Sequence, residues 1–146
     1  MPAVPLPEST HRLFDTDKHV VLVTVDADGS PQASLVWAER DGDQLLIGME
    51  GYQRKTGNLR RDPRVTLVVQ DDKPSKRGLA QYLVIRGTVE LEGPDIRAEY
   101  TELMDKQSHR YLGKDYPFEN RHSHTAVIAR VTPEKITGEG PWAVRG

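Results

Sequence analysis

The chain has 146 residues, which suits one domain with a buried core. Its composition is 36% hydrophobic and 29% charged, and a net charge of −2 lacks the basic excess typical of nucleic-acid-binding proteins. The absence of cysteine excludes disulfides, thiolate nucleophiles, iron–sulfur clusters and thiolate zinc sites.

The first third of the chain predicts an extension followed by a meander of strands. Residues 1–18 form the extension, with a short helix over 8–14 that Ser9 or Thr10 can cap. Asp-Gly pairs then separate β-branched and apolar runs, a pattern typical of hairpins. The three predicted strands cover residues 20–25, 32–39 and 44–49.

A short helix over 52–61 comes next and ends before Asp62-Pro63, because proline disfavours helix at the residue before it. Residues 71–78 are charged and predict a mobile loop. A second helix starts near Pro94 and ends near Gly113. Its apolar stripe at helical spacing comprises Ile96, Tyr100, Leu103, Met104 and Tyr111. The other strands cover 65–70, 82–92 with a bulge at Gly87, and 125–131, before a tail at 138–146.

Six strands joined largely by turns predict a mainly β protein, a closed antiparallel barrel with flanking helices, as a single domain over residues 1–146. Strands 20–25 and 65–69 are apolar on both faces, although an antiparallel barrel normally keeps one face wet. A second subunit would cover the extra face, so we expect a homodimer. No apolar run approaches the roughly 20 residues of a membrane helix, and no secretory signal is present, so we expect a cytoplasmic protein without a membrane partner.

The helix over 52–61 begins with the basic segment Arg54-Lys55-Thr56. The helix dipole disfavours cations in a first turn, and such local conflicts tend to occur at functional sites. An anion would resolve the conflict, because backbone N–H groups, both cations and the Thr56 hydroxyl could converge on a phosphate. A solvated basic helix is the alternative.

The order of elements, together with Lys55-Thr56-x-Asn58-Leu59-x-x-Asp62-Pro63-Arg64, resembles the pyridoxamine 5′-phosphate oxidase-like split-barrel superfamily. It is most similar to the short actinobacterial flavin/deazaflavin oxidoreductases of the B type, over nearly the whole chain. The resemblance implies a six-stranded, FMN-binding-like split barrel with its cofactor at a homodimer interface. In that family the matching lysine, threonine and asparagine hold the phosphate end of the cofactor. Lys55, Thr56 and Asn58 inherit this role by resemblance, with Arg54 as a helper.

The same resemblance assigns the cofactor ring to one face of the second strand, here Gln32, Ser34 and Val36. It implies a coenzyme F420-dependent reductase that transfers a hydride between the deazaflavin and a small organic substrate. FMN is the alternative cofactor, and a non-catalytic flavin-binding protein is the alternative class. The Arg-Leu-x-Pro segment with which longer family members bind pyridoxamine phosphate is absent, so we do not expect that substrate.

Other candidate sites are weaker. His122 and His124 have no third ligand at a fixed spacing, so solvated histidines are expected and no metal site. No acid–base pair is evident, and the catalytic residues stay unassigned. Trp142 lies near the end of the Gly-rich tail, and we hypothesise that it docks on the cofactor pocket of the partner subunit. Substrate specificity is expected in the loops 71–78 and 114–124.

Overall fold

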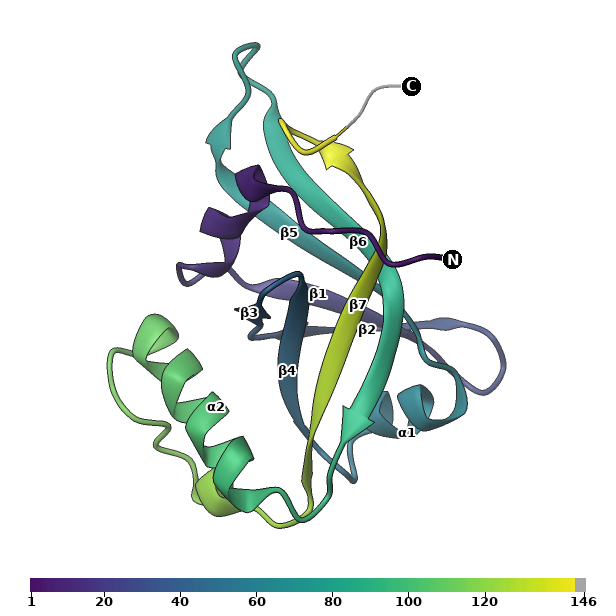
Figure 1. The fold of residues 1–146 in the computed structure, drawn as a ribbon, viewed down its shortest axis with the longest axis vertical. Coiled ribbons are helices and arrows are strands. Elements are labelled where there is room, and N and C mark those ends of the chain that lie inside the picture. The colour runs from purple at the N-terminus through teal and green to yellow at the C-terminus, as the bar shows by residue number, and fades with distance from the viewer. Residues whose placement is uncertain (144–146) are drawn as a thin grey trace.

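Seven strands form one antiparallel sheet in the computed structural model, which describes residues 1–143 (Figure 1). The strand order is β2-β1-β5-β6-β7-β4-β3. The strands are β1 Val20–Val25, β2 Pro31–Val36, β3 Glu39–Asp41, β4 Gln44–Glu50, β5 Arg64–Pro74, β6 Ala80–Glu92 and β7 Ala126–Glu139. No ladder within the described residues joins the edge strands β2 and β3, so the sheet is open there. The mainly β, antiparallel class is confirmed, whereas the predicted closure of the barrel is wrong for the described residues, because β2 and β3 do not pair.

The predicted number of six strands is one too few. The run predicted as one strand over 32–39 is divided into β2 and β3 at Trp37 and Ala38. β2 pairs with β1, whereas β3 pairs with β4 at the opposite edge of the sheet. The chain therefore leaves one ladder and enters another at these two residues, which a propensity pattern cannot show.

Two strands extend further than predicted. The prediction of a loop over 71–78 is wrong at its first half, because β5 continues to Pro74 and a turn closed by Ser75 N–H to Leu79 O (2.8 Å) leads into β6. β7 continues through Pro133 to Glu139. Pro133 lies opposite Gly87, next to a shift in register, so its missing N–H falls at an irregularity. The predicted bulge at Gly87 is confirmed.

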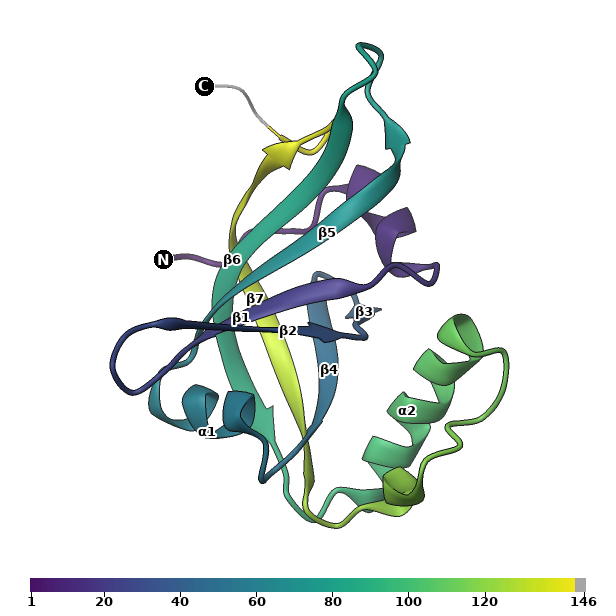
Figure 2. The same ribbon diagram turned by 180° about the vertical axis from the view of Figure 1, so that it is seen from behind.

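The helical segments are η1 Glu8–Phe14, α1 Arg54–Arg61, α2 Arg97–Tyr111 and η2 Glu119–His122. α1 and α2 lie at the same end of the sheet on different sides (Figure 2). The predicted cap of the first helix is wrong: Pro7 occupies the N-cap position, and Thr10 Oγ1 donates back to Pro7 O at 2.6 Å. No helix within residues 1–143 has the length and apolarity of a membrane span.

The predicted stripe on α2 packs against β4. Tyr100, Leu103 and Met104 are buried. Gly48 on β4 allows this close approach, because a Cβ there would lie 2.6 Å from Met104 Sδ and 3.1 Å from Tyr100 Cε1. The missing side chain of Gly48 thus sets how near α2 lies to the sheet.

The outer face of β1 and its neighbours carries an aligned apolar row. Val21 pairs with Leu35 of β2 and with Val68 of β5, and Val68 pairs with Val84 of β6. Successive residues of β1 alternate between buried and half-buried, so these valines lie on the face turned away from the core. Leu35 is 66% exposed. The sheet therefore presents an apolar row that this chain does not cover.

Candidate functional site

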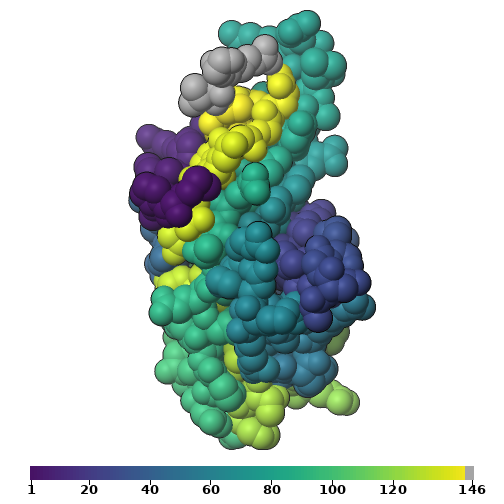
Figure 3. All heavy atoms as spheres, turned by 90° about the vertical axis from the view of Figure 1, so that its right-hand side faces the viewer, coloured from purple at the N-terminus to yellow at the C-terminus, as the bar shows by residue number. Residues whose placement is uncertain are grey.

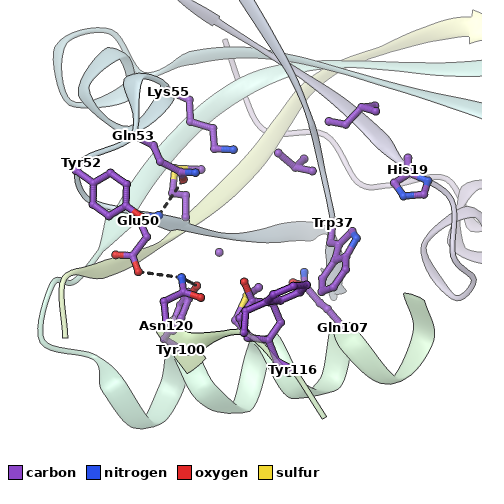
Figure 4. A pocket seen from close by; sticks show the side chains of 16 residues that line it. His19, Trp37, Glu50, Tyr52, Gln53, Lys55, Tyr100, Gln107, Tyr116 and Asn120 are labelled. Atoms are coloured by element: carbon purple, nitrogen blue, oxygen red, sulfur yellow. Dashed lines mark hydrogen bonds between the residues drawn. The ribbon is translucent and has the colours of Figure 1, made fainter. Parts of the chain in front are cut away.

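A cavity of about 260 Å³ lies between the sheet and α2, beside the start of α1 (Figure 4). Elements that are distant in sequence meet around it: the end of β2, the end of β4, the first turn of α1, the middle of α2 and the segment leading to η2. Its polar lining includes Glu50, Gln53, Lys55, Gln107 and Asn120, and its aromatic lining includes Trp37, Tyr52, Tyr100, Tyr116 and Phe118.

Lys55 is the predicted site residue that reaches this cavity with a charge. Its side chain is half-buried, and burial lowers the pKa of its ammonium group. Among residues 1–143 the ammonium has no ion pair or hydrogen bond within the chain. A desolvated charge without a partner is unfavourable, and a bound anion would relieve this cost. Lys55 is therefore a suitable anchor for an anionic group.

Arg54 points elsewhere. Its guanidinium donates to both carboxylate oxygens of Asp26, at 2.9 and 2.6 Å. Asp26 begins the turn between β1 and β2, which projects beside α1 in Figure 3. The charge of Arg54 is thus compensated within the chain, and the hydrogen bonds from Arg54 lower the pKa of Asp26. The predicted helper role of Arg54 has no geometric support in this arrangement.

Thr56 and Asn58 are buried and hold α1 in place. Thr56 Oγ1 donates to the carbonyl oxygen of Glu50 at 2.6 Å. Asn58 Nδ2 donates to Thr24 Oγ1 at 3.0 Å and to Asp26 Oδ1 at 2.9 Å. The predicted convergence of Arg54, Lys55, Thr56 and Asn58 on one point is therefore not seen, and of these four Lys55 alone lines the cavity.

The predicted ring-binding face of β2 reaches the cavity at one end. Val36 lines it, whereas Gln32 Oε1 accepts a hydrogen bond from Thr24 Oγ1 at 2.9 Å. Ser34 Oγ is buried and has no hydrogen-bond partner among the described residues. Trp142 lies in the core of its own chain, where Nε1 donates to Tyr82 O at 3.1 Å. This placement gives no support to docking of Trp142 on a partner's pocket.

Glu50 is a site residue that the sequence predictions missed. It is 5% exposed, and its carboxylate accepts hydrogen bonds from Asn120 Nδ2 (2.9 Å), Ser123 Oγ (3.0 Å) and Thr125 Oγ1 (2.8 Å). Burial opposes its ionisation, but these hydrogen bonds outweigh burial and lower its pKa below the ordinary value. The one available signal was a carboxylate directly after the apolar strand predicted over 44–49.

An aromatic wall completes the cavity. Trp37 stacks on Tyr111, with centroids 4.9 Å apart and an interplanar angle of 6°. Tyr116 meets the Trp37 ring edge-on at 6.0 Å, and Phe118 follows it at 5.0 Å. The wall includes part of the loop predicted over 114–124, whereas residues 71–78 do not line this cavity. Tyr111 was predicted as a core residue, and no sequence signal joined it to Trp37.

Tyr100 connects this wall to Glu50. Asn120 Nδ2, which donates to Glu50, also lies 3.2 Å from the Tyr100 hydroxyl as its donor. Burial raises the pKa of Tyr100 well above its ordinary value, and burial likewise raises the pKa of Tyr116. Both phenols are therefore neutral hydrogen-bonding groups at physiological pH, and among the described residues that line the cavity Glu50 provides the carboxylate.

The histidines lie outside this arrangement, apart from His19 at its edge. His122 Nδ1 lies 3.0 Å from Thr101 Oγ1 on α2. Nowhere in residues 1–143 do three His, Cys, Asp or Glu side chains come together in a group that could hold a metal ion.

Comparison with known proteins places this geometry in context. The family described as pyridoxamine 5′-phosphate oxidase matches residues 6–139. An F420 reductase of known structure is 27% identical, with a TM-score of 0.72 over 90% of this chain and 98% of that one. A conserved hypothetical protein from Mycobacterium tuberculosis is 18% identical, with a TM-score of 0.73 over 94% of this chain and 86% of its own. HutZ, a heme storage protein from Vibrio cholerae, is 17% identical, with a TM-score of 0.65 over 94% and 96% of the two chains. The last two similarities concern the fold alone.

Proposed function

The chain belongs to the pyridoxamine 5′-phosphate oxidase family, and from this premise we propose that it is a coenzyme F420-dependent oxidoreductase. It would transfer a hydride between the deazaflavin and a small organic substrate. The observation that carries the proposal is the unpaired, half-buried ammonium of Lys55 at a cavity with an aromatic wall. Similarity to an F420 reductase over 90% of the chain favours the deazaflavin over FMN.

The residues around the cavity suit the two parts of such a cofactor. Lys55 would hold a phosphate group, and Val36 at the end of β2 would contact a planar ring. Bound there, the cofactor supplies the two-electron chemistry that no side chain in the cavity offers. Cofactor-binding roles were also predicted for six other residues, Gln32, Ser34, Arg54, Thr56, Asn58 and Trp142, and these roles stay predictions. In this structure their side chains are hydrogen-bonded to other parts of the chain or buried outside the cavity.

The size of the cavity bears on the oligomeric state. Its volume of about 260 Å³ is below the roughly 300–1,000 Å³ of sites for drug-sized ligands. Its rim carries exposed apolar side chains, Leu35 (66%), Tyr52 (81%) and Phe118 (54%). Leu35 also belongs to the apolar row on the outer face of the sheet. We propose that a second copy of the chain covers this row and enlarges the site.

Light scattering after size exclusion tests the homodimer. Leu35→Asp places a charge in the exposed row and should shift the protein to monomer, because a buried unpaired carboxylate opposes association. Leu79→Asp is the matched control, since Leu79 is 52% exposed in the turn between β5 and β6, away from the row. A monomeric wild-type protein would contradict the proposal.

Cofactor titration tests the function. Apo-protein is titrated with coenzyme F420 and, separately, with FMN, following ligand fluorescence at low and high salt. Lys55→Ala should raise the dissociation constant roughly tenfold to a hundredfold, the value of one charge-assisted hydrogen bond. Lys76→Ala, an exposed lysine in the β5–β6 turn, should leave it unchanged.

Each outcome has a separate meaning. Preference for FMN would keep Lys55 as the anchor and change the cofactor. Binding of neither cofactor would indicate that α1 is only a solvated basic helix and would refute the proposed function. Tight binding without oxidation of the bound, reduced cofactor by any supplied acceptor would favour the non-catalytic alternative.

A further inference from the structure

The cavity contains two charges of opposite sign that do not pair with one another. Lys55 reaches it from the first turn of α1, and Glu50 approaches it from the end of β4. No ion pair joins them, because their charged atoms lie more than 4.0 Å apart. Figure 4 shows the Glu50 carboxylate turned towards Asn120, with Lys55 extending separately from α1. The cavity therefore has a positive side and a negative side.

The negative side has no cationic partner within residues 1–143. All the side-chain donors to the Glu50 carboxylate are neutral: Asn120, Ser123 and Thr125. The nearby guanidinium of Arg60 is exposed and donates to the carbonyl oxygen of Gly51 at 3.2 Å. Neutral donors stabilise a carboxylate but leave its charge in place, so a negative potential extends into the adjoining cavity.

Aromatic rings surround the same side. Tyr100 shares the Asn120 amide with Glu50, and Tyr116, Trp37 and Phe118 continue the wall from there. Aromatic faces are electron-rich and attract cations, and this attraction grows when the cation is desolvated. A buried carboxylate and several aromatic rings thus favour the same kind of ligand, a flat group with positive charge.

We propose that the side of the cavity formed by Glu50, Tyr100, Tyr116 and Trp37 is a subsite for a planar organic cation, such as a protonated or quaternary nitrogen heteroaromatic ring. This inference rests on the proposed oxidoreductase function in one respect only: that function makes the cation the substrate class. Binding of the cation itself depends on Glu50 and the aromatic wall, and Lys55 excludes the cation from the opposite side. An anionic ligand group would instead be directed to Lys55.

Calorimetric titration of the apo-protein with three small probes tests this subsite. The probes are N-methylquinolinium, neutral quinoline at pH 7.5 and anionic 1-naphthoate, which have similar flat shapes and different charges. Wild-type protein should bind the cation about tenfold more tightly than quinoline, as expected for a desolvated cation–π contact beside a carboxylate. Quenching of Trp37 fluorescence should accompany binding, while Trp142 stays shielded in the core.

Two variants that each remove one carboxylate distinguish an effect of the Glu50 charge from an effect of the overall charge of the protein. Glu50→Gln keeps the size of the side chain, removes its charge and should abolish the preference for the cation. Glu119→Gln removes an exposed charge from the adjacent η2 and should retain it. Equal binding of cation and quinoline, no binding of the cation, or an equal loss in both variants would overturn the subsite.

A further variant covers the case in which Glu50→Gln does not fold. Tyr116→Leu retains the carboxylate and removes one ring, so cation affinity should fall several-fold more than quinoline affinity; an equal fall would overturn the subsite. Cofactor titration distinguishes this proposal from the preceding one. Cation preference without binding of coenzyme F420 or FMN would support the subsite and refute the oxidoreductase function. Cofactor binding without cation preference would support the oxidoreductase function and refute the subsite.

Discussion

Replacing Gly48 by alanine should force α2 away from the sheet and disturb the cavity without adding any polar group. The new Cβ would lie 2.6 Å from Met104 Sδ and 3.1 Å from Tyr100 Cε1. Met104 ends in a flexible thioether that can move, but Tyr100 is 2% exposed and is hydrogen-bonded to Asn120. The strain therefore falls on the ring that joins α2 to Glu50.

The expected cost is that of overpacking a well-filled interior, about 1–3 kcal/mol. For a domain of this size, that loss lowers the melting temperature by roughly 3–9 °C. The dissociation constant of N-methylquinolinium should also rise, because Tyr100 and Met104 both line the cavity. Urea denaturation measures the loss of stability, and calorimetric titration measures the dissociation constant of N-methylquinolinium on the same preparations.

Gly57→Ala is the matched control for this substitution. Gly57 lies within α1, and a Cβ there would meet nothing within 4 Å. This variant should gain up to about 1 kcal/mol of stability from helix propensity. Adding Met104→Val to Gly48→Ala should recover part of the lost stability, because valine lacks the crowded sulfur. Unchanged stability and unchanged probe affinity in Gly48→Ala would refute the close-packing argument.

Further predictions concern positions outside the cavity. The Arg12 guanidinium holds the pKa of Asp71 well below its usual range, so the folded protein binds fewer protons there than the unfolded chain. This stabilisation is present above about pH 4 and is lost as the pH falls through the lower pKa of the folded state. Asp71→Asn should therefore lower the free energy of unfolding by roughly 1–3 kcal/mol at pH 7. The free energy of unfolding of the variant should also fall less steeply in acid than that of the wild-type protein. Urea midpoints at several pH values measure both. Trp142→Phe should cost about 1–3 kcal/mol, because Tyr82 O loses a buried donor; a rise in the cofactor dissociation constant equal to that of Lys55→Ala would instead restore Trp142 to the binding site.

Local patterns predicted most of the fold because they depend on neighbouring residues. Asp-Gly turns marked the early hairpins, and Gly87 marked a bulge that is present. Pro133 misled the prediction of the last strand, since a proline normally ends a central strand, but here it faces that same bulge. The charged segment from Asp71 was predicted as loop, yet Arg12 from η1 pairs with Asp71 and stabilises it within β5.

The cavity was less predictable because its walls are joined only in three dimensions. Lys55 and Val36 were predicted through the family resemblance, and both line it. Glu50 gave only the weak signal of one carboxylate after an apolar run. The stacking of Trp37 on Tyr111 depends on how α2 lies over the sheet, so the spacing of these residues in the sequence does not predict it.

The insertion between β6 and β7 has a consequence for evolution and engineering. Glu92 and Ile128 are paired neighbours in the sheet, so the chain leaves and returns at nearly the same place. The intervening residues include α2, η2 and one side of the cavity, anchored internally by Arg121 on Asp105 and by Thr101 on Arg121 O. The segment also packs on β4 at Gly48 and donates from Gln107 Nε2 to Leu46 O, so a recipient of this segment must offer the same close approach. Grafting it would move Tyr100 and Tyr116 into the recipient, whereas the counterparts of Glu50, Trp37 and Lys55 would come from the recipient's own β4, β2–β3 link and α1.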